Sequence, residues 1–551
     1  MSGAPSDVHA ISAVDAAATA TATATAAAGK AKAASSEPWI LAATILGSSL
    51  SFIDGTVVNV ALPTMQRDLR ATGAEVQWVV EAYALFLAAL ILVGGSLGDR
   101  LGRRLVYAVG IGVFALASVW CGLAPNVTWL IIGRAVQGVG GALLVPGSLA
   151  IISASFDGAR RGKAIGTWSG FTTVTSALGP VLGGWLVQNA SWRWVFFINI
   201  PLAALTLALV FWHVPESRDE GEKGRLDVVG ALLVTVGLGA LVYGLIEWGA
   251  TSNLGSPVVL GGLAVGVAAL ALFLLAEGRE RNPMMPLSLF RSRTFSGANA
   301  LTLLLYGGLG GALYFLPFNL QQVQGYSATA AGASLLPFTV VVFALSRWTG
   351  GLVGRVGARI PLTVGPLIVA AGFALFARPD LGGSYWATYF PAVLVMSVGM
   401  ALVIAPLTTT VMGAVEQSHS GLASGVNNAV SRTAGLLAIA VLGIAVAGSF
   451  NNSLDSRLSA LKTSPAVTSS IDGQRGKLAG VQIPAGVGAR ERATLRRAVD
   501  ESYVSGFRLA MLIAAGLAVV SAAIAFFFLG GKSGATPQQA PLASRDPGPR
   551  A

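Results

Sequence analysis

Residues Gly95–Arg104 read Gly-Ser-Leu-Gly-Asp-Arg-Leu-Gly-Arg-Arg, and residues Gly350–Arg359 read Gly-Gly-Leu-Val-Gly-Arg-Val-Gly-Ala-Arg. The two stretches align, and each closes the second apolar segment in a series of six. This internal repeat predicts a chain built from two related halves around a central site. The second copy has Gly354 where the first has Asp99, so only the first copy carries an acid.

Fourteen apolar segments surround these two stretches. A helix needs about 20 apolar residues to cross the hydrocarbon core of a bilayer, and all fourteen meet or approach that length. The runs are too long for strands and lack the alternation of a barrel. We therefore predict an all-α polytopic membrane protein with fourteen transmembrane helices. They run over Pro38–Pro63, Val76–Leu97, Leu105–Leu123, Trp129–Ala154, Ala164–Gln188, Trp194–Trp212, Val228–Trp248, Val258–Ala276, Phe295–Leu320, Ala330–Val353, Ile360–Ala377, Trp386–Gly413, Gly421–Ala447 and Gly506–Leu529.

The predicted domain order follows from these segments. Residues 1–37 form a low-complexity Ala/Thr/Ser tract without the features of a signal peptide, and we interpret them as a disordered tail. Residues 38–212 make the first six-helix half, and 213–294 hold two extra helices that we expect to lie outside both halves. Residues 295–529 make the second half, and 530–551 a disordered C-terminal tail.

Composition supports the membrane assignment. Hydrophobic residues make up 54% of the 551-residue chain and charged residues 11%, whereas soluble proteins carry about 25% charged residues. The net charge of +11 sits in short loops, which favours control of topology over nucleic-acid binding. One cysteine, Cys121, excludes internal disulfides and thiolate clusters. Three histidines far apart in sequence give no reason to expect a metal site.

Basic residues also predict the orientation. Fifteen lie in loops on the side of the termini and four in short loops opposite, so we place both termini in the cytoplasm and residues 448–505 outside. The four are Arg67, Arg70, Arg193 and Arg378. The fifteen are Arg100, Arg103, Arg104, Arg160, Arg161, Lys163, Arg218, Lys223, Arg225, Arg279, Arg281, Arg291, Arg293, Arg355 and Arg359.

Two acids lie in the interior of apolar segments, away from a segment's last residues. Asp54 belongs to the first, in Ile-Asp-Gly-Thr-Val-Val-Asn-Val-Ala-Leu-Pro over residues 53–63. An ionised carboxylate there costs at least about 2.5 kcal/mol, so burial favours the protonated form and makes Asp54 a candidate proton carrier. The alternative is an aspartate that hydrogen-bonds a neighbouring helix. Glu81, in the second segment, is a second candidate or a hydrated residue near the interface.

Arg134 begins the stretch Arg-Ala-Val-Gln-Gly-Val-Gly-Gly in the fourth segment. An arginine in a membrane helix needs a partner or a wet cavity, unless it snorkels to the surface. The helical rise places Asp54, Glu81 and Arg134 about 13, 8 and 8 Å below the outer surface. We predict that Asp54 is the principal proton site, tuned by Arg134, with Glu81 as a relay. Rotation about each helix axis is not fixed by this argument.

The fifth segment carries Gly166 and then Gly-Pro-Val-Leu-Gly-Gly over residues 179–184. Clustered small residues let helices approach closely, and Pro180 removes a backbone hydrogen bond and kinks the helix. Packing alone would account for any one of these glycines.

The four motifs, in this order and on these helices, resemble the major facilitator superfamily, in its group of fourteen-spanner drug:proton antiporters. The resemblance covers Trp39–Leu529. It implies that Asp54 acts in proton coupling or substrate recognition and that Arg134 belongs to the proton-transfer apparatus. It also implies a cytoplasmic gate element at the loop of Gly98, Asp99, Arg100, Gly102, Arg103 and Arg104.

The fifth-helix motif resembles the antiporter signature, which separates exporters from uptake systems within this superfamily. Its matching residues are Gly166, Gly179, Pro180, Gly183 and Gly184. Thr175 stands where the signature has a further glycine, a departure that counts against export. Other intramembrane polar residues are candidates for lining a substrate cavity, or for interhelical hydrogen bonds. They are Asn59, Gln137, Asn319, Gln322, Asn427, Asn428 and Arg432.

These features predict a secondary transporter rather than an enzyme. We expect proton-coupled export of lipophilic or cationic drugs from the cytoplasm or inner leaflet by alternating access, in the cell membrane. The partners would be the small-molecule substrate, protons and lipid, with no nucleic acid, no cofactor and a monomeric state. An exporter of one endogenous metabolite is the alternative, ahead of a proton symporter. A membrane enzyme or sensor would need a catalytic cluster or an appended soluble domain, and the sequence shows neither.

Overall fold

The computed structural model describes residues 7–156, 158–218, 226–280, 283–416 and 420–530. This part is almost entirely helical, and no strand occurs within it. Fourteen of its helices are long and apolar enough to cross a membrane, which confirms the predicted fold class. The predicted C-terminal tail lies, from residue 531 onward, outside the described residues.

The chain divides into two compact units. Unit 1 comprises Met1–Met285, Pro317–Leu336 and Asp455–Val499, and unit 2 comprises Pro286–Leu316, Pro337–Leu454 and Asp500–Ala551. The predicted second half began at residue 295, yet two of its segments, 317–336 and 455–499, pack with unit 1. The division therefore passes through helices instead of following the order of the sequence.

Helices from the first part of the chain belong to unit 1. Their bounds are α1 (Asp7–Asp68), α2 (Gly73–Leu101), α3 (Arg103–Leu123), α4 (Val127–Ser155), α5 (Gly158–Asn189), α6 (Trp194–Phe197), α7 (Asn199–His213), α8 (Val228–Thr251) and α9 (Pro257–Glu277). The remaining elements are η1 (Leu287–Arg291), α10 (Arg293–Phe318), η2 (Asn319–Val323), α11 (Ala328–Ala333), α12 (Leu336–Thr349), α13 (Leu352–Val356), α14 (Arg359–Phe376), α15 (Tyr385–Gly413), α16 (Ser420–Leu461), α17 (Pro465–Asp472), η4 (Arg475–Gly480) and α18 (Ala489–Phe528).

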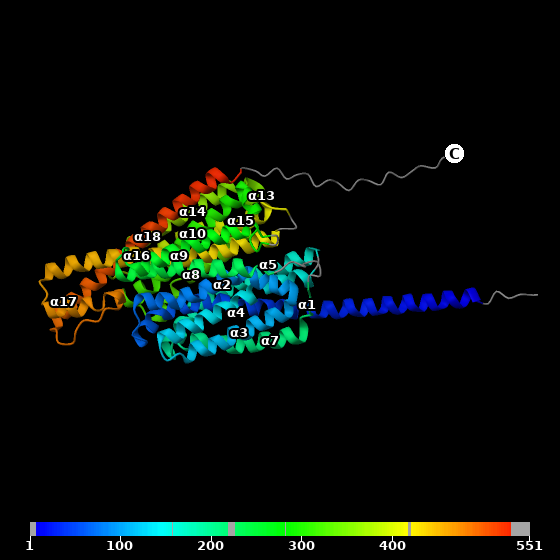
Figure 1. Cartoon of the computed structure of the whole chain (residues 1–551), viewed down its shortest axis with the longest axis horizontal. Helices are drawn as coiled ribbons and strands as arrows, with labels where there is room; N and C mark the ends of the chain where they lie inside the picture. The colour runs from blue at the N-terminus through cyan, green and yellow to red at the C-terminus, as the bar shows by residue number, and fades with distance from the viewer. Residues whose placement is uncertain (1–6, 157, 219–225, 281–282, 417–419, 531–551) are drawn as a thin grey trace, which may run out of the picture. The chain divides into compact units, whose positions relative to one another are not determined.

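Glycines fix the packing of α4 against α2 and α3, which run beside it in Figure 1. A Cβ atom at Gly138 would lie 2.5 Å from the carbonyl oxygen of Tyr83 on α2. One at Gly140 would lie 2.6 Å from the backbone nitrogen of Phe114 on α3. Small residues at such contacts let membrane helices approach backbone to backbone. The glycines of the Arg134–Gly141 stretch therefore hold α4 between its two neighbours.

Polar side chains set where these helices begin. Thr72 and Glu75 form a capping box at the start of α2, in which the Thr72 nitrogen donates to Glu75 Oε2 at 2.8 Å. At the start of α4, the side chain of Asn126 accepts a hydrogen bond from the Trp129 nitrogen at 3.0 Å. Such caps satisfy backbone N–H groups that have no partner within the helix.

The two extra helices pack on each other, and α8 also packs on α2. Gly244 of α8 has room for hydrogen alone, because a Cβ atom would lie 2.9 Å from the Leu263 nitrogen of α9. On the α2 side, the rings of Trp78 and Tyr243 lie 6.3 Å apart. Both helices group with unit 1, and their predicted place outside the two halves stays a prediction.

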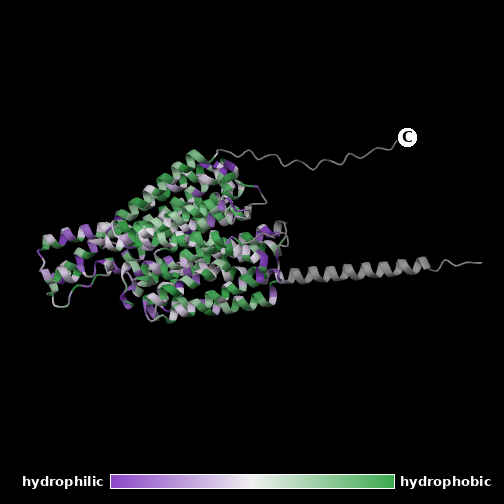
Figure 2. Ribbon diagram, viewed as in Figure 1, coloured by the Kyte–Doolittle hydropathy of each residue, from purple (hydrophilic) through white to green (hydrophobic). Residues whose placement is uncertain are grey.

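Helices extend further than the apolar segments at three places. Residues 7–37, predicted to be disordered, continue α1 toward its N-terminus, in line with the high helix propensity of alanine. The predicted outer segment 448–505 is also largely helical, since α16 runs on to Leu461 and α18 begins at Ala489. Figure 2 shows hydrophilic residues along this segment and apolar residues along the bundled helices.

The internal repeat is visible in the backbone. Gly102, at the end of α2, has a φ of 119°, and Gly357, at the end of α13, has a φ of 80°. Each donates its N–H to the carbonyl four residues earlier, Gly98 and Val353. Because side chains disfavour positive φ, glycine is the residue suited to both turns.

Candidate functional site

A buried ion pair lies at the centre of unit 1. Arg134 Nη1 of α4 lies 2.5 Å from Asp54 Oδ2 of α1, and both residues are almost completely buried, at 1% and 0% exposure. The sequence placed the two groups at similar depths, and the structure brings them into contact. An ion pair sealed from water needs further hydrogen bonds to offset the loss of hydration.

Gln137 supplies several of those hydrogen bonds. It lies one turn after Arg134 on α4 and accepts from Arg134 Nη1 through its Oε1 at 2.6 Å. Its Nε2 donates to Asp54 Oδ1 at 2.8 Å and to Ser118 Oγ of α3 at 2.9 Å. Asn199 of α7 donates to the same two oxygens, at 3.3 Å each. Side chains of α4 and α7 thus bind the carboxylate of α1, and Ser118 of α3 joins the same hydrogen-bond network.

The guanidinium of Arg134 is also held by α2. Its Nε donates to the Val79 carbonyl at 3.0 Å, and its Cζ lies 4.3 Å from the centre of the Tyr83 ring. The Tyr83 hydroxyl lies 2.7 Å from Ser51 Oγ, three residues before Asp54 on α1. The arginine therefore does not snorkel, and its charge is balanced by a carboxylate, neutral oxygens and an aromatic face.

Glu81 is buried at 0% exposure on α2, two residues after Val79. Its carboxyl group lies beside the side-chain amide of Gln77, one turn earlier, but no hydrogen bond of normal geometry reaches either carboxyl oxygen from the described residues. No hydrogen bond or ion pair joins Glu81 to the Asp54 cluster among the described residues. Asp54 is therefore the acid whose carboxylate is fully hydrogen-bonded, and Glu81 is a second buried acid outside that hydrogen-bond network.

The loop after α2 is tied down by ion pairs and by an acid that the sequence reasoning missed. Asp99 Oδ1 accepts from Arg103 Nε at 2.7 Å, one turn later. Glu216, beyond α7, accepts from the Arg104 and Leu105 nitrogens at 3.1 and 3.2 Å. A Cβ atom at Gly102 would lie 2.7 Å from that carboxylate. Glu216 had no recognisable signal, because it lies in an irregular segment with no fixed spacing to the loop.

The glycines of the fifth-helix motif pack α5 against two other helices of unit 1. Cβ atoms at Gly179 and Gly183 would lie 2.0 Å from Thr56 Oγ1 and 2.6 Å from Val57 Cγ2, both on α1. At Gly184 a Cβ atom would lie 2.3 Å from the Ala328 carbonyl of α11. Gly166 has open space around its Cβ position. Thr175, the departure from the signature, lies 3.2 Å from Ser49 Oγ of α1.

The remaining cavity candidates are scattered over both units. Asn59 makes a long hydrogen bond of 3.4 Å to the Gly55 carbonyl of its own helix. In unit 1, Gln322 donates to Gln66 at 2.9 Å. In unit 2, Asn427 donates to Asn299 at 3.1 Å and to Thr302 at 2.8 Å. Asn319 is buried, Arg432 is half-buried and Asn428 is exposed. No single site joins these residues in the described structure of either unit.

Comparison with known proteins identifies the relatives of this arrangement. The profile of the Major Facilitator Superfamily matches residues 44–439. The multidrug resistance protein Stp of Mycobacterium tuberculosis strain CDC 1551 is 36% identical, over 87% of this chain and 90% of that protein. The tetracenomycin C resistance and export protein of Streptomyces glaucescens is 34% identical, over 89% of this chain and 91% of that protein.

Solved structures share the fold. The chain is similar to a bacterial homolog of the human lysosomal transporter Spinster, in an inward-facing and occupied conformation. The TM-score is 0.58 and the identity 20%, with 89% of this chain and 96% of that chain covered. At this identity the likeness concerns the arrangement of helices.

Proposed function

Because this chain belongs to the major facilitator superfamily of membrane transporters, we propose that it exports lipophilic or cationic small molecules in exchange for protons. Its relatives include proteins named for multidrug resistance and for antibiotic resistance and export. The observation that carries the proposal is the buried Asp54–Arg134 pair, whose hydrogen-bond network joins α1, α3, α4 and α7. The driving force would be the proton gradient across the cell membrane, with both termini in the cytoplasm and no cofactor.

Protonation of Asp54 would change which helices are held together. A proton on Asp54 removes the negative charge that holds Arg134 to α1. The guanidinium keeps its bonds to Gln137 on α4 and to Val79 on α2, so it would stay with α2 and α4 while α1 is released. Ion pairs between elements are a common means of holding one of two states. Loss of the proton restores the pair and completes the cycle.

Glu81 is the second proposed proton site. A buried carboxylate without partners is costly when ionised, so a proton is the simplest way to keep Glu81 neutral in this state. Residues two apart on a helix point to different faces, so exchange of protons between Glu81 and the Asp54 cluster would have to pass through water. We propose Asp54 as the principal site and Glu81 as the relay.

The loop after α2 is the proposed gate on the cytoplasmic side. Asp99 and Arg103 are paired within one helical junction, while Glu216 ties the start of α3 to the end of α7. A solvent-accessible ion pair contributes at most about 1 kcal/mol, so the half-buried Asp99–Arg103 pair can break and form as the protein changes state. We propose that Glu216 belongs to this gate together with Asp99, Arg103 and Arg104.

A drug-resistance screen tests the proposed function. The full chain is expressed in a host stripped of its own efflux pumps and exposed to ethidium, puromycin, tetracenomycin C and other antibiotics. We expect resistance that disappears when a protonophore collapses the proton gradient. Resistance to one compound alone would favour the dedicated exporter, for which a relative named for tetracenomycin C is the precedent. Raised uptake in place of resistance would contradict export.

A further inference from the structure

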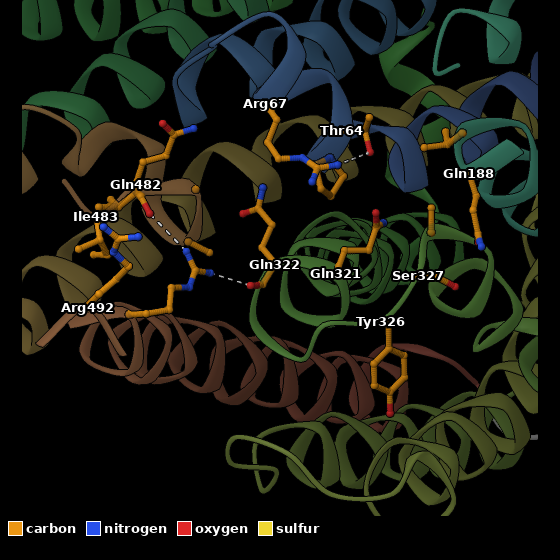
Figure 3. Close-up of a pocket in the computed structure, with 17 residues that line it drawn as sticks. Thr64, Arg67, Gln188, Gln321, Gln322, Tyr326, Ser327, Gln482, Ile483 and Arg492 are labelled. Atoms are coloured by element: carbon orange, nitrogen blue, oxygen red, sulfur yellow. Dashed lines mark hydrogen bonds between the residues drawn. The ribbon is translucent and has the colours of Figure 1, made fainter. Parts of the chain in front are cut away.

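Unit 1 contains a large cavity at one end of its membrane helices, and none of the residues of the Asp54 cluster lines it. Its volume is about 820 Å³, within the roughly 300–1,000 Å³ typical of small-molecule sites. The walls come from the last turns of α1 and α5, the segment after η2, residues 479–483 and the first turns of α18. Figure 3 shows Arg67, Gln322, Gln482 and Arg492 reaching toward it from separate segments. The predicted topology places it on the outer side.

The lining is strongly basic. Three arginines line the cavity, and no aspartate or glutamate occurs among the described residues that do so. Arg67 and Arg492 donate to neutral oxygens. Arg67 donates to Thr64 Oγ1 at 3.4 Å, and Arg492 donates to the carbonyls of Ala485 at 2.6 Å and Val487 at 3.4 Å. The third, Arg496, donates to the carbonyls of Gln322 at 2.7 Å and Val481 at 3.3 Å. Like charges gathered in a concave site attract anions strongly.

Hydrogen-bond donors and apolar surface complete the lining. Side-chain amides come from Gln188, Gln321, Gln322 and Gln482. Burial raises the pKa of Tyr326, so its phenol keeps its proton and can donate a hydrogen bond at neutral pH. Pro63, Val187 and Ile483 add apolar surface. The arginines and amide donors would suit an oxyanion at one end of a ligand, and the apolar residues would suit an apolar body.

The outer segment is held in place over this cavity. Gln66 of α1 donates to the Lys477 carbonyl at 3.2 Å and accepts from Gln322 at 2.9 Å. Arg475 pairs with Asp455 and, at 2.7 Å, with Asp472, and these carboxylates raise the pKa of its guanidinium. Because α1, η2, η4 and α18 are bonded to one another here, the segments that carry the three arginines are held together without a ligand.

We propose that this cavity binds an amphiphilic organic anion, whose carboxylate or phosphate is held by Arg67 or Arg492. The guanidinium group donates two parallel hydrogen bonds to such oxyanions, which a neutral amide cannot reproduce. The oxyanion belongs either to a soluble organic acid or to the headgroup of a lipid, since both share this chemistry. The site is independent of proton coupling at Asp54.

Binding to the purified full chain in a neutral detergent tests the proposal without any transport. Phenyl phosphate is titrated by calorimetry, with benzyl alcohol as the uncharged match. Retention of phosphatidylglycerol against phosphatidylcholine is measured by native mass spectrometry. The variant Arg67→Gln/Arg492→Gln removes the two arginines, and Arg490→Gln/Arg497→Gln removes the same charge from exposed residues of α18 that do not line the cavity. Unliganded melting temperatures confirm that both variants are folded.

The binding results distinguish a site for soluble organic acids, a site for a lipid headgroup and the absence of an anion site. Binding of phenyl phosphate by the parent, weakened at least about tenfold in Arg67→Gln/Arg492→Gln and unchanged in the control, supports a site for soluble organic acids. Selective retention of phosphatidylglycerol that is lost in the same variant supports a lipid headgroup. Absence of binding with both probes, or binding that both variants retain equally, overturns the anion site. None of these results depends on export or on the proton gradient.

Discussion

Replacement of Gln137 tests whether the buried Asp54–Arg134 cluster stabilises the protein. Gln137 accepts from Arg134 and donates to Asp54 and Ser118. Gln137→Leu keeps a similar volume but leaves these partners short of hydrogen bonds, at about 1–3 kcal/mol for a buried unsatisfied group. We expect a lower unfolding temperature in detergent, with Asn428→Leu, at an exposed position, as the control. Equal unfolding temperatures for Gln137→Leu and the parent would show that the cluster does not stabilise unit 1.

Sequence reasoning found part of this cluster. Asp54 and Arg134 stood out because charges are rare within apolar segments, and their depths followed from the helical rise. Gln137 was recognised as a cavity candidate but not as their common partner. Ser118 and Asn199 were missed, since small or amide side chains are ordinary in membrane helices. Which residues meet depends on rotation about each helix axis, and one sequence carries no direct record of that rotation.

At the scale of elements, Gly183 tests whether the fifth-helix motif works through packing. A Cβ atom there would lie 2.6 Å from Val57 Cγ2 and 2.8 Å from the Val57 carbonyl. Gly183→Leu should force α5 away from α1 and destabilise the protein by about 1–3 kcal/mol. Gly166→Leu, in the same motif but with open space at its Cβ position, is the matched control. Similar yields and unfolding temperatures for the two variants would contradict the packing role.

The fourteen spans were predictable because hydrocarbon selects for long apolar runs. The residues at which these helices begin and end were less predictable. The α16 and α18 helices continue into polar residues such as Arg457 and Arg497, where hydropathy stops indicating a span but helix formation continues. The alanine-rich start of α1 was interpreted as disordered on composition, although alanine is also the strongest helix former. Hydropathy marks what crosses a membrane, not where a helix ends.

For the whole molecule, orientation is the testable property. The fifteen-to-four distribution of basic loop residues predicts that α17 lies outside and the segment before α10 inside. In a Cys121→Ala background, a cysteine at Ser469, which is exposed in α17, should react with an impermeant thiol reagent applied to intact cells. A cysteine at Ser292 should react after the membrane is opened. The reverse pattern would invert the topology, and the anion cavity would then face the cytoplasm.

The internal repeat does not determine which segments of the chain pack together in each of the two units. The motif pair correctly indicated equivalent turns at Gly102 and Gly357. It gave no reason to expect that residues 317–336 and 455–499 would pack with the first unit. Those contacts join residues several hundred positions apart, such as Gln66 with Lys477, and involve common polar groups without a motif.

The most direct test of the central claim is proton-coupled efflux by the reconstituted protein. Vesicles are loaded with a compound identified in the resistance screen, and a pH gradient is imposed. Exchange of the compound without a gradient serves as the measure of folding and binding. We predict that Asp54→Asn keeps gradient-independent exchange but loses acceleration by the pH gradient. Full gradient-dependent export by Asp54→Asn would contradict the account and pass the coupling role to Glu81 or another residue.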